Sequence, residues 1–194
     1  PVEVVGDAED TGTMVTFHPD PEIFQVTTVY KYDTLAARLR ELAYLNKGIH
    51  LSLTDRRNLV NDVDENGNEL ETQHYRSDVF YSKEGLREFV DYLDGGAEKL
   101  IETPIYLETD KIIPIEIALQ YNTSYTEKIY SYVNNINTIE GGTHLQGFKM
   151  GLTRTLKNYA DKNGMLAKLK FDLAADDFRE GLTAVVSVKV AEPQ

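Results

Sequence analysis

The longest regular pattern of hydrophobic positions lies between residues 143 and 164. Apolar residues recur there at steps of three and four, which predicts a helix with one buried stripe. The stripe consists of Leu145, Phe148, Leu152, Leu156 and Tyr159. Thr143 and Gln146 fit a capping box at the start of the helix, and Asn163-Gly164 fits its end.

Basic side chains accompany that stripe. From Thr143 to Lys170 there are six Lys or Arg residues and one acid, a local charge of +5 in a chain whose net charge is −12. Lys149, Thr153 and Lys157 are spaced four apart, so we expect them to form one exposed row. A basic row on an acidic protein is a candidate surface for a phosphate backbone. A solvated helix face with cations near its C-terminal end is the simpler alternative, and charge alone favours it.

The rest of the chain alternates between shorter helical and extended patterns. Two helices are predicted, at 33–46 and from Ser82 to the glycines at 95–96, because apolar residues share one face in each. Residues 55–71 are acidic and rich in Asn and Gly, which predicts a hairpin loop. Strands are predicted at 12–17, 49–53, 72–76, 105–107, 113–121, 128–133 and 182–190. Such a mixture predicts an α/β or α+β fold.

Composition limits the chemistry that this chain can perform. With 194 residues it makes one large domain or two small ones, and it has no cysteine for a disulfide or a thiolate zinc site. The four histidines, at 18, 50, 74 and 144, have no metal-ligand spacing, and no nucleophile or P-loop motif is present. There is no long apolar run and no signal-peptide pattern, so we expect a cytoplasmic protein that does not enter a membrane.

Four stretches of the chain together resemble the B-subunit family of bacterial DNA gyrases, which are type IIA topoisomerases. They are TGTMVTFHPDPEIF at 11–24, YDTLAARLRELAYLNKG at 32–48, NNINTIEGGTHLQGF at 134–148 and REGLTAVVSVKVAEPQ at 179–194. The resemblance covers nearly the whole chain, and its most specific part is the run at 134–148. The B-type subunit of topoisomerase IV is the related alternative.

The resemblance implies an α+β fragment of a longer protein. Residues 1–80 would form the C-terminal part of a GHKL-type ATPase domain, and residues 81–194 a transducer domain. That transducer would resemble the domain 2-like fold of a ribosomal protein, with a left-handed βαβ crossover. The family's catalytic glutamate would precede this chain, and its Gln-Thr-Lys loop would follow Gln194.

The resemblance also assigns residues to sites. Thr13 matches a threonine that helps to hold the adenine ring, and Val15 matches a residue of the pocket wall. An ordinary strand threonine and core valine are the structural alternatives. Lys149 matches an arginine that lines the cavity through which DNA passes, and Arg154 and Lys157 follow from it by helix geometry. No catalytic residue and no metal ligand are expected in this chain.

The function implied by the resemblance belongs to the whole protein. It would use ATP and Mg²⁺ to drive DNA strand passage and negative supercoiling, together with the gyrase A subunit and a second B subunit. The fragment alone would be inactive and would bind no cofactor. A free-standing, non-enzymatic DNA-binding module is the alternative from another functional class.

Overall fold

The computed structural model describes residues 3, 6–7 and 9–193, except for the side chain of Lys168. The chain forms two units, residues 1–32 and residues 33–194. The described residues before Tyr32 form no helix or strand and have one turn, where the carbonyl oxygen of Asp20 accepts hydrogen bonds from the amides of Ile23 and Phe24.

The predicted strand at 12–17 is wrong. These residues are assigned to no strand, and their large apolar side chains are exposed, with Met14 at 93% and Phe17 at 68%. Their apolar and polar residues alternate as in a strand, but a strand is stable only when it pairs with a neighbour and covers an apolar face. Among the described residues, the segment has neither.

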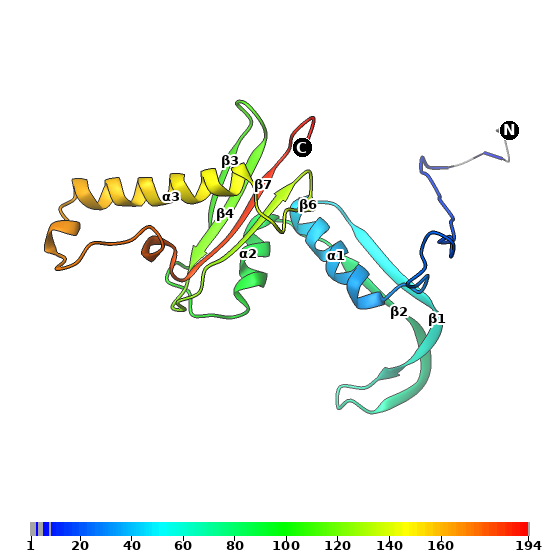
Figure 1. The fold of residues 1–194 in the computed structure, drawn as a ribbon. Helices are drawn as coiled ribbons and strands as arrows, with labels where there is room; N and C mark the ends of the chain where they lie inside the picture. The colour runs from blue at the N-terminus through cyan, green and yellow to red at the C-terminus, as the bar shows by residue number, and fades with distance from the viewer. Residues whose placement is uncertain (1–2, 4–5, 8, 194) are drawn as a thin grey trace. The chain divides into compact units, whose positions relative to one another are not determined.

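The second unit begins with a helix and a long β-hairpin (Figure 1). Helix α1 (Tyr32–Leu45) confirms the prediction at 33–46 and is followed by strands β1 (Leu51–Val63) and β2 (Glu69–Phe80), which pair antiparallel. The predicted loop at 55–71 is therefore too long, since only the turn at 64–68 separates the strands. Most residues of both strands are exposed, and the hairpin buries no apolar face. Polar residues that look like a loop in the sequence can therefore belong to its strands.

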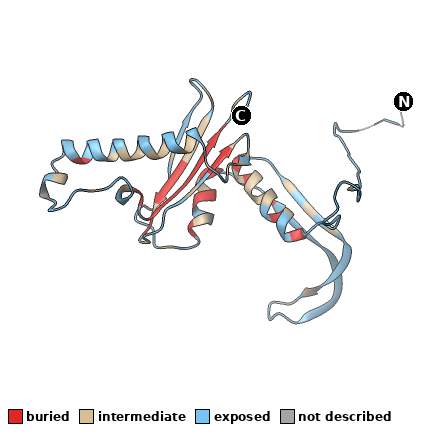
Figure 2. Cartoon of the chain, in the orientation of Figure 1, coloured by how far each residue is buried: buried red, intermediate tan, exposed pale blue. Residues whose placement is uncertain are grey.

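A five-stranded mixed sheet forms the centre of this unit. Its strands lie in the order β3-β4-β7-β5-β6, and all neighbours are antiparallel except β5 and β7. The strands are β3 (Ile105–Thr109), β4 (Ile115–Tyr121), β5 (Lys128–Val133), β6 (Ile136–Asn137) and β7 (Leu182–Val188). The predictions at 105–107, 113–121, 128–133 and 182–190 are confirmed within a few residues, and β6 was not predicted. Every residue of β7 is buried (Figure 2).

Helices cover the two faces of the sheet. On one face, Val185 of β7 belongs to a core cluster with Phe89 and Val90 of α2 (Leu86–Asp94), which also includes Leu45 of α1. On the other face, Phe148 and Leu152 of α3 (Thr143–Lys162) pack against a cluster of Leu119, Leu182 and Ala184. Because β5 and β7 are parallel neighbours, α3 lies in the crossover that a parallel pair requires.

Helix α2 begins later than predicted. It starts at Leu86 rather than at Ser82, because the Ser82 hydroxyl accepts a hydrogen bond from the amide of Gly85 (2.8 Å) and Gly85 has a φ of 62°. That hydroxyl bond holds a turn before the helix rather than its first turn. The helix ends as predicted at Gly95, which adopts the left-handed conformation.

Helix α3 has the predicted span but differs in two details. The capping box is wrong, because Gly142 is the N-cap, no side chain caps the N-terminus of the helix, and the Gln146 amide donates to the Gly142 carbonyl (3.0 Å). The predicted stripe is half-buried as far as Leu156, but Tyr159 is 60% exposed. Figure 1 shows why, since the C-terminal half of α3 extends beyond the sheet.

Two short 3₁₀ helices, Leu166–Lys168 and Asp177–Arg179, connect α3 to β7. Even α3, with 20 residues, is not apolar enough to cross a membrane, and no other helix in the described residues meets that requirement.

The turn before β7 depends on a glycine. Gly181 has a φ of 70°, and an added Cβ would overlap the carbonyl oxygen of Asn122 and lie 2.7 Å from that of Ser124. We expect Gly181→Ala to lower the free energy of unfolding by about 3 kcal/mol or more. Gly151→Ala in α3, where an added Cβ meets nothing within 4 Å, should raise it by about 1 kcal/mol. Urea unfolding followed by circular dichroism measures both changes, and equal effects would contradict the role of Gly181.

Candidate functional site

The basic side chain that carries the DNA hypothesis is held in an ion pair. Lys149, in the second turn of α3, places its Nζ 2.5 Å from Oε1 of Glu127, just before β5. The side chains of Lys149 and Glu127 are 28% and 29% exposed. The predicted exposed row is therefore wrong at Lys149 and at Thr153, which are half-buried, and confirmed at Lys157. Solvent reaches Lys149, so it is not sealed in the core.

A buried arginine fixes the other oxygen of Glu127. The Nε of Arg179 donates to Oε2 of Glu127 (2.8 Å), and its remaining nitrogens donate to Thr153 Oγ1 (3.1 Å), the Ala175 carbonyl (2.9 Å) and the Asp176 carboxylate. The Arg179 side chain is only 10% exposed. We call Glu127, Lys149, Asp176 and Arg179 the Glu127 cluster. It contains two cations and two anions and is therefore neutral.

The contacts within the cluster shift the pKa of two of its members. Burial acts to raise the pKa of Glu127, but hydrogen bonds and positive charge from Lys149 and Arg179 lower it below its ordinary value. Burial acts to lower the pKa of Arg179, and its bonds to Glu127 and Asp176 raise it instead. Both groups are therefore charged at neutral pH. Sequence reasoning missed Glu127 and Arg179, because nothing in the pattern pairs residues so far apart.

The other predicted site residues lie elsewhere. Arg154 and Lys157 are exposed on α3, and neither forms an ion pair with any residue that the structure describes. Thr13 and Val15 are exposed in the first unit, Val15 at 75%. Their proposed contacts with adenine remain a prediction.

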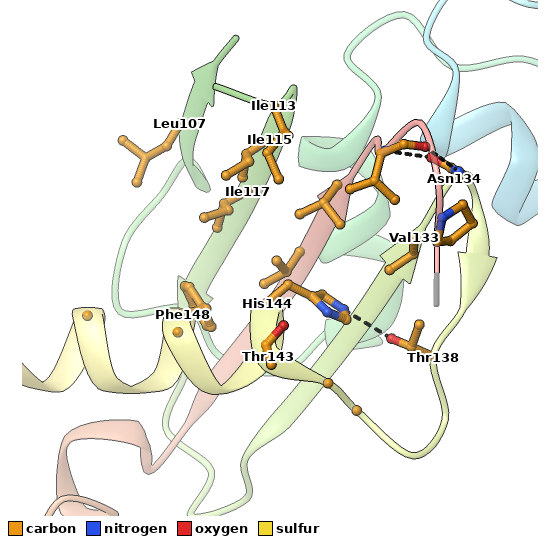
Figure 3. Close-up of a pocket in the computed structure, with 18 of the residues that line it drawn as sticks. Leu107, Ile113, Ile115, Ile117, Val133, Asn134, Thr138, Thr143, His144 and Phe148 are labelled. Atoms are coloured by element: carbon orange, nitrogen blue, oxygen red, sulfur yellow. Dashed lines mark hydrogen bonds between the residues drawn. The ribbon is translucent and has the colours of Figure 1, made fainter. Parts of the chain in front are cut away.

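An apolar groove lies between the first half of α3 and the sheet (Figure 3). Its volume is about 1270 Å³, and its walls include Ile115 and Ile117 of β4 and Phe148 of α3. At its polar end His144 Nε2 lies 3.2 Å from Thr138 Oγ1, and burial lowers the pKa of His144. The groove therefore offers apolar surface and a neutral imidazole rather than a set of charged groups.

The turn at Asn134-Asn135 joins three parts of the second unit. Both residues have positive φ, 50° and 66°, as a tight hairpin turn requires, and asparagine tolerates this conformation. Arg38 of α1 donates to the Asn135 carbonyl (2.6 Å), and the Asn134 side chain makes two hydrogen bonds with the backbone of Val190, each 2.9 Å. The turn thus ties α1 to the sheet and to the chain that leaves β7.

The Glu127 cluster predicts a pH dependence of stability. A carboxyl whose pKa is lower in the folded state stabilises the protein above its unfolded pKa, and this stabilisation is lost as the pH falls through the folded pKa. Glu127→Gln should therefore lower the free energy of unfolding at pH 7, and the difference from wild type should shrink below about pH 4. Urea unfolding between pH 3 and pH 7 measures it. A difference that stays constant over this range would contradict the prediction.

Comparisons with known sequences place the chain among gyrase B subunits. The sequence model described as DNA gyrase B matches residues 85–194. The DNA gyrase B subunit of Cytophaga hutchinsonii is 58% identical over 195 residues, and that of Eisenibacter elegans is 57% identical over 194. Both alignments include the whole of this chain, which spans 38% of the length of each relative.

Solved structures support the same assignment. The 43K ATPase domain of Thermus thermophilus gyrase B, in complex with an aminocoumarin, is similar with a TM-score of 0.71 and 36% identity, over 91% of this chain and 44% of that one. The ATP-binding domain of Francisella tularensis topoisomerase IV shares the fold, with a TM-score of 0.60 and 22% identity, over 87% and 41% of the two chains. The chain therefore belongs to the DNA gyrase B family.

Proposed function

We propose that this chain is part of a gyrase B subunit in which it couples ATP binding and hydrolysis to DNA strand passage and negative supercoiling. The gyrase B relatives that align with the whole chain support this function. The observation that carries it is the direct packing of α1 against α2 and the core of the five-stranded sheet. Tyr44 of α1 stacks on Phe89 of α2 with ring centroids 5.0 Å apart, and Leu45 is buried in the same core cluster. Movement of α1 would reach the sheet through these contacts.

We propose that residues 1–80 are the C-terminal part of a GHKL-type ATPase domain and residues 81–194 a transducer domain. The crossover from β5 through α3 to β7 would be left-handed, as in the domain 2-like fold of the ribosomal protein. The parallel pairing of β5 with β7 is compatible with this topology but does not fix the hand. Thr13 and Val15 would border the adenine pocket.

The DNA-facing surface of the proposed function is α3. Lys149, Arg154 and Lys157 would contact phosphates of a duplex, a sequence-independent interaction that suits DNA in transit. A lysine supplies a point charge in place of the bidentate fork of an arginine. Besides DNA, the partners would be the gyrase A subunit and a second B subunit.

ATP and Mg²⁺ would be the cofactors of the complete subunit. In the part of the chain that the structure describes, no three His, Cys, Asp or Glu side chains gather to hold a metal ion. By resemblance, this chain would supply no Mg²⁺ ligand, and its contribution would lie in coupling rather than in the chemical step.

A first test concerns the chain by itself. We expect the purified 194-residue chain to hydrolyse no ATP, because by resemblance the catalytic glutamate lies outside it. A coupled-enzyme ATPase assay measures the rate, with a complete gyrase B subunit as the positive control. Saturable hydrolysis by the chain would contradict the assignment. Salt-dependent DNA binding by the chain alone, reporting several phosphate contacts, would favour a free-standing binding module instead.

A second test concerns Lys149. In a complete gyrase B subunit that carries this chain, assembled with the A subunit, Lys149→Ala should reduce DNA-stimulated ATP hydrolysis more than basal hydrolysis. The slope of the logarithm of DNA affinity against the logarithm of salt concentration should also become shallower by about one, because one phosphate contact is lost. Lys162→Ala, which removes the same charge from the end of α3, is the matched control. Equal losses of stimulated and basal hydrolysis would remove Lys149 from the DNA path.

A further inference from the structure

We propose that Glu127 is a built-in competitor of the DNA backbone for Lys149. In the absence of DNA, Glu127 holds the lysine in an ion pair, and a phosphate must displace the carboxylate before Lys149 can contact the duplex. This inference rests on the proposed function of α3 as a DNA-facing helix. It adds a residue, Glu127, that sets how strongly that helix binds.

The geometry gives Glu127 two separate tasks. Its Oε2 is anchored by Arg179, whose other two nitrogens are hydrogen-bonded elsewhere, and its Oε1 meets Lys149 at 2.5 Å. Arg179 is buried whereas Lys149 is 28% exposed. The carboxylate is therefore fixed on its protein side, and Lys149 is accessible from the solvent side. A phosphate oxygen can take the place of Oε1 at the lysine while Arg179 keeps its own bond to Glu127.

An ion-pair partner distinguishes Lys149 from Arg154 and Lys157 on the same helix. Arg154 and Lys157 have no ion-pair partner among the described side chains, so they attract a phosphate without exchange. At Lys149 the neutral cluster must first open. Replacing one anion by another at a half-exposed lysine changes the free energy little, because such pairs are weak in water. The contact is therefore reversible, which suits a duplex that passes along the helix.

The test uses Glu127→Gln in a complete gyrase B subunit assembled with the A subunit. Glutamine keeps an oxygen acceptor for Arg179 but loses the charge that holds Lys149. We expect half-maximal stimulation of ATP hydrolysis at a DNA concentration about two- to fivefold lower, the range expected for release of one half-exposed ion pair. Asp161→Asn is the matched control, since it removes one negative charge from α3 at an exposed residue without an ion pair among those described. Asp161→Asn should lower the DNA concentration for half-maximal stimulation by a smaller factor.

The combined variant shows whether the gain passes through Lys149. Adding Lys149→Ala to Glu127→Gln should abolish the increase. Glu127→Asp provides a second variant, because it keeps a charge beside Arg179 but shortens the reach to Lys149, and it should shift the response in the same direction. Circular dichroism of each variant identifies any that fails to fold.

Three results would overturn the inference. If Glu127→Gln behaves like Asp161→Asn, or weakens the response to DNA, Glu127 only positions α3, and the proposed function of Lys149 stands. If the gain survives in the combined variant, Glu127 acts through another cation. If Lys149→Ala alone leaves DNA stimulation unchanged, the DNA-facing role of Lys149 fails, and the inference fails with it.

Discussion

The pairing of β7 with a neighbour on each side is the constraint on which the five-stranded sheet and its two covering helices depend. All seven of its residues are buried, antiparallel to β4 and parallel to β5. A strand buried on both faces needs a cover on each. Helix α2 supplies one cover and α3 the other, and α3 must lie in the crossover because β5 and β7 are parallel. The position of the basic helix is thus linked to the burial of this one strand.

One of the residues that hold α3 in place, Lys149, is also a residue that the family resemblance assigns to DNA. Phe148 and Leu152 pack on the sheet, while Lys149 and Thr153 bind Glu127 and Arg179. In the proposed function Lys149 would therefore serve both the packing of α3 and DNA binding, and a substitution there changes both the position of α3 and its charge. This overlap is why basal and stimulated hydrolysis have to be compared, since lost packing alters both whereas a lost phosphate contact alters the second.

Local patterns in the sequence predict what local physics determines. The span of α3 follows from its periodicity and from its terminal glycines, and β7 follows from its β-branched run. The strand at 12–17 could not be judged locally, because pairing depends on residues distant in sequence. The ion pair of Glu127 and Lys149 could not be predicted locally either, because a single acidic residue before a strand forms no recognisable sequence pattern. The proposed roles of Thr13 and Val15 come from resemblance alone, because an exposed threonine and an exposed valine carry no chemistry of their own.

Strand β5 brings these observations together. Glu127 directly precedes it, and the turn at Asn134-Asn135 directly follows it. One end therefore contacts α3 through Lys149, and the other contacts α1 through the bond from Arg38 to Asn135. Six residues of strand separate the two ends, a distance of about 20 Å. Because β5 is paired with β7 along its whole length, it cannot bend independently of the sheet. In the proposed function, the helix on the nucleotide side and the cation on the DNA side are thus connected by a single strand of the central sheet.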